Sequence, residues 1–131
     1  MNEIETSIVL DLQIKPYNID AAGHVNNAVY INWLEDLRIN LFHKIVPMDE
    51  VLKKGYYLVV VSTTIEYKRP LYLFDKPVGK AKVDKFEKGI WFLSFVIELD
   101  NKVVARAKQK CVFVDSKSNK MVKHKMTTLF L

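Results

Sequence analysis

Apolar and polar residues alternate near the start of this chain and again through most of its second half. Between these two regions, apolar residues recur at the spacing of a helix. Residues 7–15 alternate loosely, which predicts a first strand. After Asn26 or Asn27, either of which is a good N-cap residue, apolar side chains recur every three or four positions up to about residue 45. This spacing predicts one long helix whose apolar stripe consists of Val29, Tyr30, Trp33, Leu34, Leu37, Leu41 and Ile45. Pro47 then follows as a stop signal.

After Gly55 the repeat shortens to two residues, the period of a strand with one buried face. Pro70, Lys88-Gly89 and Asp100-Asn101 interrupt the alternation and predict strand ends or turns. The predicted inner faces are Val59, Val61, Thr63, Ile65 and Tyr67; Gly79, Ala81 and Val83; Trp91, Leu93, Phe95, Ile97 and Leu99; and Val103, Ala105, Ala107, Gln109, Cys111 and Phe113. The opposite positions include Lys80, Lys82, Asp84, Arg106, Lys108 and Lys110. Residues 121–131 predict a last edge strand.

The long helix has to bury its apolar stripe, and the inner face of the sheet is the surface available to it. A strand, one long helix and four or five antiparallel strands therefore predict an α+β fold in which a curved antiparallel sheet wraps around one central helix. At 131 residues the chain has the length of one domain, and we expect residues 1–131 to form a single domain.

The composition narrows the class of protein. Half of the residues are hydrophobic, which is enough to bury a core without disulfides or a structural metal. Cys111 is the single cysteine, so we expect no internal disulfide, and we expect its side chain to be buried. A lone thiol fits a reducing compartment, which predicts a cytoplasmic protein. No apolar run approaches the roughly 18 residues that a membrane span requires, so we expect none.

The net charge of +5 is concentrated at one end of the chain. Residues 101–131 contain eight Lys and Arg residues and one acidic residue, Asp115, whereas the first 100 residues carry a net charge of −2. Such a segment attracts the phosphates of a nucleotide-bearing substrate, an acidic carrier protein or nucleic acid, and it is also typical of a solvated strand face. Aromatic and basic residues do not alternate as in an RNA-binding platform, so we expect no nucleic-acid partner.

The segment Asp20-Ala-Ala-Gly-His-Val-Asn-Asn-Ala-Val-Tyr30 places a carboxylate, a glycine, an imidazole and two amides directly before the predicted helix. The first turn of a helix offers unpaired N–H groups and a partial positive charge, which polarise a carbonyl. A nearby carboxylate attacks such a carbonyl or activates water. Together they indicate hydrolysis of an activated acyl group, although Asp20 by its position alone is also a common turn residue.

The run from Asp20 to Glu35 resembles the signature of hotdog-fold acyl thioesterases, in particular the 4-hydroxybenzoyl-CoA thioesterase-like group. Its helix entrance, His24-Val-Asn-Asn27, is also similar to that of the plant acyl-carrier-protein thioesterases. The likeness covers nearly the whole chain in element order, including the strand that ends in Tyr67-Lys-Arg-Pro70, and residues 17–38 are its motif-specific part. The resemblance implies a hotdog fold.

The resemblance also implies roles for two residues of the motif. By this likeness Asp20 is the nucleophile or the general base, and a backbone N–H near Asn27 holds the thioester oxygen. Sites in these enzymes lie between two subunits, so the resemblance implies a homodimer or a homotetramer. The chain departs from the plant pattern at Ala22, where the plant enzymes have an asparagine. We expect no cofactor, and because the three histidines are far apart in the sequence we expect no metal site.

The other candidate residues have more than one interpretation. His24 orients the carboxylate or a water molecule, or hydrogen-bonds its own loop. Gly23 allows a sharp turn and the close approach of a ligand, and Asn26 is a cap by its chemistry alone. Tyr30 fits the core or a subunit contact better than the substrate, and a Thr63 hydroxyl that faces a partner's helix would line the site. The candidate catalytic residues are Asp20, His24 and Asn27, and the candidate substrate-binding residues are Gly23, Val25, Asn26, Tyr30 and Thr63.

Acyl-CoA hydrolysis to free acid and CoA is the function that these features favour. Water would attack the thioester with help from Asp20 while first-turn amides polarise its carbonyl, and basic side chains would attract the phosphates of CoA. One alternative is a thioesterase that acts on acyl groups carried by acyl carrier protein, since a basic segment suits an acidic carrier. The other is a non-catalytic module that binds or senses acyl-CoA.

Overall fold

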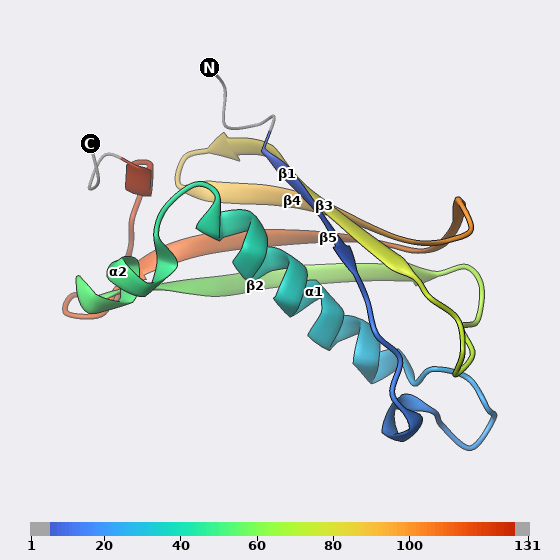
Figure 1. The fold of residues 1–131 in the computed structure, drawn as a ribbon. Coiled ribbons are helices and arrows are strands. Elements are labelled where there is room, and N and C mark those ends of the chain that lie inside the picture. Colours follow the sequence, from blue (N-terminus) through green and yellow to red (C-terminus); the bar gives the residue numbers. More distant parts are fainter. Residues whose placement is uncertain (1–5, 128–131) are drawn as a thin grey trace.

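A curved antiparallel sheet wraps around one long helix in the computed structural model, which describes residues 6–127 (Figure 1). This is the α+β arrangement that the sequence predicts. The elements are β1 (Ser7–Asp11), the 3-10 helix η2 (Pro16–Asn18), α1 (Asn27–His43), α2 (Met48–Lys53), β2 (Tyr56–Tyr67), β3 (Val78–Glu87), β4 (Ile90–Leu99), β5 (Lys102–Asp115) and β6 (Lys120–Met121). Neither helix in this part of the chain is long and apolar enough to cross a membrane.

The strand order in the sheet is β1-β3-β4-β5-β2, with β6 paired to β5. Every pair is antiparallel, and β1 and β2 form the two outer edges. The β2–β5 pairing runs from Tyr56 opposite Asp115 to Tyr67 opposite Ala105. Because β2 ends at Tyr67, the residues that follow it lie beside the start of α1.

Helix α1 begins and ends close to the predicted positions. Asn26 is its N-cap, and the Asn26 side chain accepts a hydrogen bond from the N–H of Ala28. Six of the seven predicted stripe residues are buried, and Leu37 and Leu41 are completely buried in the core. The core cluster continues into the sheet through Val83, Trp91, Leu93, Phe95 and Phe113. The apolar repeat in the sequence matches the buried positions of α1 because the sheet covers only one side of this helix.

Strand β3 approaches α1 closely at Gly79. An added Cβ atom at this position would lie 2.9 Å from Cδ1 of Leu37 and 3.0 Å from Cδ1 of Leu12. Both leucines are buried, so neither side chain has free space into which to move. The missing side chain of Gly79 therefore sets how closely helix and sheet pack.

One predicted boundary is wrong near the helical region, and one short helix there was not predicted. Strand β1 ends at Asp11 rather than near residue 15, because the chain turns into η2, although the N–H of Leu12 still donates to the carbonyl of Pro77 (3.0 Å). Pro47 follows α1 as predicted, but it also begins α2, which the sequence does not predict. Six residues are too few to show a helical repeat.

A β-bulge between Val60 and Ser62 changes the face of β2. Leu58 and Val60 pack against the core before the bulge and Ile65 does so after it, whereas Val61 is 60% exposed. The single inner face predicted from Val59 to Tyr67 is therefore wrong in its first half. One extra residue in a strand reverses the alternation that follows it.

The last predicted strand is also too long. Strand β6 includes only Met121 of the predicted range 121–131, residues 122–127 form no strand, and residues 128–131 lie outside the described part of the chain. The other predicted inner faces are confirmed on β3 and β4, and on β5 from Ala105 to Phe113. Cys111 is buried, as expected.

Candidate active site

Asp20 lies in a tight loop that its own carboxylate stabilises. Its Oδ1 atom accepts hydrogen bonds from the N–H groups of Ala22 (2.9 Å) and His24 (3.3 Å). The backbone closes the same loop, since the N–H of Asp20 donates to the carbonyl of His24 (2.8 Å). Gly23 has a φ of +83°, a left-handed conformation that suits glycine. The Oδ2 atom of Asp20 has no hydrogen-bond partner among residues 6–127 and is available to a ligand.

The first turn of α1 leaves one backbone donor unused. The N–H of Ala28 donates to Oδ1 of Asn26 (3.0 Å), and that of Val29 donates to the Asn26 carbonyl (2.9 Å). The N–H of Asn26 itself donates to the carbonyl of Asn18 (2.8 Å). Within residues 6–127 the N–H of Asn27 has no acceptor, and it stands at the positive end of the helix dipole. It is therefore a donor ready for a carbonyl oxygen.

A pocket of about 310 Å³ joins these two features, and Asp20, His24, Val25, Asn27 and Tyr30 line one side of it. The segment that follows β2 forms the other side, with Tyr67, Lys68, Arg69 and Pro70. One backbone hydrogen bond joins the two sides, and two others anchor the second side to β5. The N–H of Val25 donates to the carbonyl of Leu71 (2.8 Å), and the N–H groups of Lys68 and Arg69 both donate to that of Val104 (2.8 and 3.1 Å).

Two tyrosines meet on the inner side of the pocket. The rings of Tyr30 and Tyr67 pack edge to face with their centroids 5.1 Å apart, and the hydroxyl of Tyr67 donates to the carbonyl of Asn27 (3.3 Å). Burial, with a smaller contribution from Tyr67, raises the pKa of Tyr30 to about 12. Burial also raises the pKa of Tyr67 above its usual value of 10.0. Both hydroxyls therefore keep their protons at neutral pH.

The imidazole of His24 faces the pocket and does not touch the carboxylate of Asp20 through a hydrogen bond. The link between the two residues is the backbone N–H of His24. The His24 ring instead contacts the ring of Tyr72, edge to face, at a centroid distance of 5.1 Å. His24 is half-buried in this position, and its ring nitrogens have no hydrogen-bond partner in the described part of the chain.

Not every candidate residue from the sequence reaches this pocket. Asn26 lies beneath it as the helix cap, and Gly23 lies in the exposed loop, where a Cβ atom would meet nothing within 4 Å. Thr63 lies apart on β2, where its Oγ1 accepts a hydrogen bond from Nε2 of Gln109 (3.2 Å). Gln109 in turn accepts one from Arg38 (3.1 Å). A contact between Thr63 and substrate therefore stays a prediction that requires a second subunit.

No site role was predicted for the residues on the far side of the pocket. Tyr67, Lys68, Arg69 and Pro70 end a predicted strand, and Tyr72 follows them, so they are about 40 residues from the motif. The one signal that could have found them is the resemblance itself, which extends to Tyr67-Lys-Arg-Pro70. Chemically, the pocket combines a free carboxylate oxygen, a free backbone donor and two cations. This combination suits an acyl group that is attached to a phosphate-bearing carrier.

A family model described as the thioesterase-like superfamily matches residues 14–126 of this chain. The chain is 32% identical over 111 residues to the chloroplastic acyl-acyl carrier protein thioesterase ATL3 of Arabidopsis thaliana, a match that covers 82% of this chain and 58% of the plant protein. It is 30% identical over 111 residues to the long-chain acyl-CoA thioesterase FadM of Escherichia coli, with coverages of 83% and 84%. The chain thus spans less than two thirds of the plant relative.

Solved structures of similar shape include the probable thioesterase YbaW from Escherichia coli, with a TM-score of 0.76, 28% identity and coverages of 90% and 89%. The DHNA-CoA thioesterase from Staphylococcus aureus has a TM-score of 0.82, 15% identity and coverages of 89% and 80%. At 15% identity the second likeness concerns the fold alone. These neighbours confirm the hotdog fold that the sequence motif implies.

Proposed function

The chain belongs to the thioesterase-like superfamily, and from this premise we propose that it hydrolyses acyl-CoA thioesters to the free acid and CoA. The observation that carries the proposal is the pairing of Asp20 and Asn27 in one pocket. Asp20 contributes a carboxylate oxygen, and Asn27 contributes a backbone N–H, that have no hydrogen-bond partner among residues 6–127. The acyl-CoA substrate is also the one named for the Escherichia coli relative FadM.

In the proposed reaction the thioester oxygen accepts a hydrogen bond from the N–H of Asn27. Negative charge builds on that oxygen as the carbonyl carbon becomes tetrahedral, and the helix N-terminus stabilises it. Oδ2 of Asp20 either takes a proton from the attacking water or attacks the carbon itself, in which case water then hydrolyses the resulting anhydride. In either route the C–S bond breaks as the tetrahedral intermediate collapses, before any anhydride is hydrolysed. The CoA thiolate takes the proton held by Asp20 in the first route and a proton from solvent in the second.

The remaining pocket residues would bind and orient the substrate. Lys68 and Arg69 supply positive charge at the rim, which attracts the phosphates of CoA. Val25 and the ring of Tyr30 give the acyl side of the pocket an apolar surface. His24 lines the same pocket and would hold the water molecule or the leaving sulfur.

We also propose that the working form is a homodimer or homotetramer with the site between subunits. Strand β2 lies at the edge of the sheet and exposes Val61, so its backbone is open to another strand. Thr63 follows on the same strand and would line a site that a second subunit completes. We further propose that the chain forms a single domain and works in the cytoplasm. The unpaired, buried thiol of Cys111 supports the cytoplasmic location, because free thiols persist in a reducing compartment.

The test is a thiol-release assay on acyl-CoA substrates of several chain lengths, with wild-type protein and Asp20→Asn. Asparagine keeps the oxygen that accepts from Ala22 and His24 but removes the base and nucleophile, so we expect kcat to fall by about 10²-fold or more with an unchanged fold. Asp100→Asn is the matched control, because Asp100 lies in the β4–β5 turn with a φ of 52° that asparagine also tolerates.

Wild-type rates in Asp20→Asn would remove Asp20 from the mechanism. A second candidate function is acyl-CoA sensing without turnover, which the small pocket and the cations Lys68 and Arg69 beside it also suit. Tight binding of acyl-CoA with no thiol release, across all chain lengths, would select that function over hydrolysis.

A further inference from the structure

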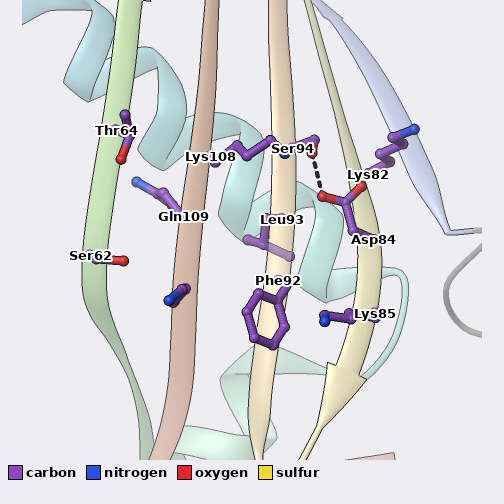
Figure 2. A pocket seen from close by; sticks show the side chains of 11 residues that line it. Ser62, Thr64, Lys82, Asp84, Lys85, Phe92, Leu93, Ser94, Lys108 and Gln109 are labelled. Atoms are coloured by element: carbon purple, nitrogen blue, oxygen red, sulfur yellow. Dashed lines mark hydrogen bonds between the residues drawn. The ribbon is translucent and has the colours of Figure 1, made fainter.

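The face of the sheet that points away from α1 carries basic residues in register. Strand pairing places side chains of β3, β4, β5 and β2 opposite one another in three consecutive rows. The rows are Lys80–Val96–Arg106–Glu66, Lys82–Ser94–Lys108–Thr64 and Lys85–Phe92–Lys110–Ser62. We call these three rows the basic face. Figure 2 shows part of it from outside, with α1 behind the strands.

The positive charge of the basic face is only partly neutralised within the chain. Lys80 pairs with Glu98 (3.0 Å), and the carboxylate of Asp84 accepts a hydrogen bond from Ser94. Among residues 6–127, neither Lys82 nor Lys108 lies within ion-pair distance of a carboxylate. The same holds for Lys85 and Lys110, which instead lie over the ring of Phe92 at 4.5 and 5.7 Å. Like charges at this spacing repel one another, and an anionic partner would relieve that repulsion.

The basic face is also hollowed. A groove of about 650 Å³ crosses the strands between Ser62 and Lys85, and Phe92 forms part of its floor. An adjoining groove of about 390 Å³ extends it to Glu66 and Arg106. The two share Thr64, Lys82, Ser94 and Lys108, so they form one continuous depression. A surface of this shape admits a protruding element rather than a flat one.

The groove leads toward the candidate active site. Glu66 and Arg106 form the row nearest to it, and the next residue on β2, Tyr67, lines the catalytic pocket with Lys68. At the rise of a strand, Thr64 and Lys68 are about 13 Å apart. A partner bound in the groove would therefore have its edge beside the pocket that contains Asp20.

We propose that the basic face docks an acidic acyl carrier protein, which delivers its acyl group to the Asp20–Asn27 pocket; this rests on the proposed thioesterase function. The face is four strands wide, about 15 Å, which matches the 10–12 Å diameter of one helix with its side chains. The hydroxyls of Ser62 and Thr64 beside the lysines suit a protein surface that carries acidic and polar residues. Two plant relatives are named as acyl-acyl carrier protein thioesterases.

Other occupants fit the basic face less well. A second copy of the chain would bring like charge against like, which is costly at an interface. Nucleic acid is disfavoured because the single aromatic ring on the face, Phe92, is covered by Lys85 and Lys110 and is not open to a stacked base. Carboxylates at Glu66 and Asp84 further interrupt the continuous positive track that a polyanion would follow.

The experiment compares dodecanoyl groups attached to CoA and to the acyl carrier protein of Escherichia coli as substrates of one set of variants. In Lys82→Glu/Lys108→Glu we expect kcat/KM for the carrier substrate to fall at least tenfold through KM, and that for dodecanoyl-CoA to change less than twofold. The matched control is Lys102→Glu/Lys117→Glu, which makes the same charge change at exposed positions outside the rows and should leave both rates unchanged. Wild-type turnover of the carrier substrate should fall with added salt.

The possible outcomes separate the two proposals. In Lys82→Glu/Lys108→Glu, equal losses on both substrates, or no loss on the carrier substrate, would overturn docking on this face. A variant whose main change is in its oligomeric state or in its binding of duplex DNA would overturn it as well. Wild-type protein that cleaves dodecanoyl-CoA but not the carrier substrate would overturn docking alone. Protein that cleaves neither would overturn the thioesterase function itself. If the reversed variant fails to fold, Lys82→Gln/Lys108→Gln provides the same comparison.

Discussion

The hydroxyl of Tyr67 donates a hydrogen bond of 3.3 Å to the backbone carbonyl of Asn27. Tyr67 is the last residue of β2, and Asn27 is the first residue of α1. This bond therefore joins the two chain segments that form the pocket. The bond holds Asn27, the residue whose backbone N–H is free to bind a thioester oxygen.

Replacing Tyr67 by phenylalanine should lower activity more than stability. The variant keeps the ring contact with Tyr30 and loses only a partly exposed hydrogen bond, which costs about 0.5–1.5 kcal/mol in unfolding free energy. We expect kcat/KM to fall several-fold because the first turn of α1 is less firmly held. Tyr57→Phe, on the same strand, is the control. Steady-state kinetics and urea unfolding of both variants test this prediction. Equal values of kcat/KM in Tyr67→Phe and Tyr57→Phe would contradict the role of Tyr67.

The N-cap of α1 should matter for stability and for catalysis together. In Asn26→Ala the N–H of Ala28 loses its acceptor, which costs about 1 kcal/mol. Two unpaired amides then compete for solvent at the helix start, and we expect kcat to fall as well. Asn26→Ser restores an acceptor and should recover both quantities. Asn32→Ala, on the exposed side of the helix, should change neither appreciably; a stable but inactive Asn26→Ser would instead show that Asn26 contacts the substrate.

A methyl group at Gly79 should force helix and sheet apart. Because the added Cβ atom would lie within 3.0 Å of both Leu12 and Leu37, Gly79→Ala should lower the unfolding free energy by about 1–3 kcal/mol. Shortening the facing side chain in Gly79→Ala/Leu37→Val should recover part of that loss relative to the sum of the single variants. Thermal unfolding of the three variants measures the coupling. Strict additivity would show that the contact is not the cause.

Stability should fall at high pH through a buried thiol. Burial raises the pKa of Cys111 from 9.0 to about 11, although Arg38 acts in the opposite direction. The folded protein thus holds this proton more tightly than the unfolded chain, so stability is intact below pH 9.0 and is lost as the pH rises through 11. The loss attributable to the thiol is up to about 3 kcal/mol. Urea unfolding of wild type and Cys111→Val across this range tests it, and parallel curves would contradict it.

Local features of the sequence were sufficient to predict the helix and half of the pocket. The spacing of Val29, Trp33 and Leu37 depends only on the pitch of a helix, and Asn26 caps it through neighbouring backbone atoms. The loop of Asp20 closes through hydrogen bonds that span no more than four residues. Such short-range interactions depend only on neighbouring residues in the sequence, so the motif and the helix could be predicted together.

Tertiary structure decided the rest. The bulge after Val60 reversed a face that alternation alone assigns wrongly, because the register with β5 determines where an extra residue is placed. Tyr67 and Lys68 reach the pocket only through pairing between β2 and β5, and the basic face exists only because strand pairing aligns the basic residues of β3 and β5 on either side of β4. Contacts between residues far apart in the chain depend on strand order and register, and these follow from how the whole sheet packs around its helix.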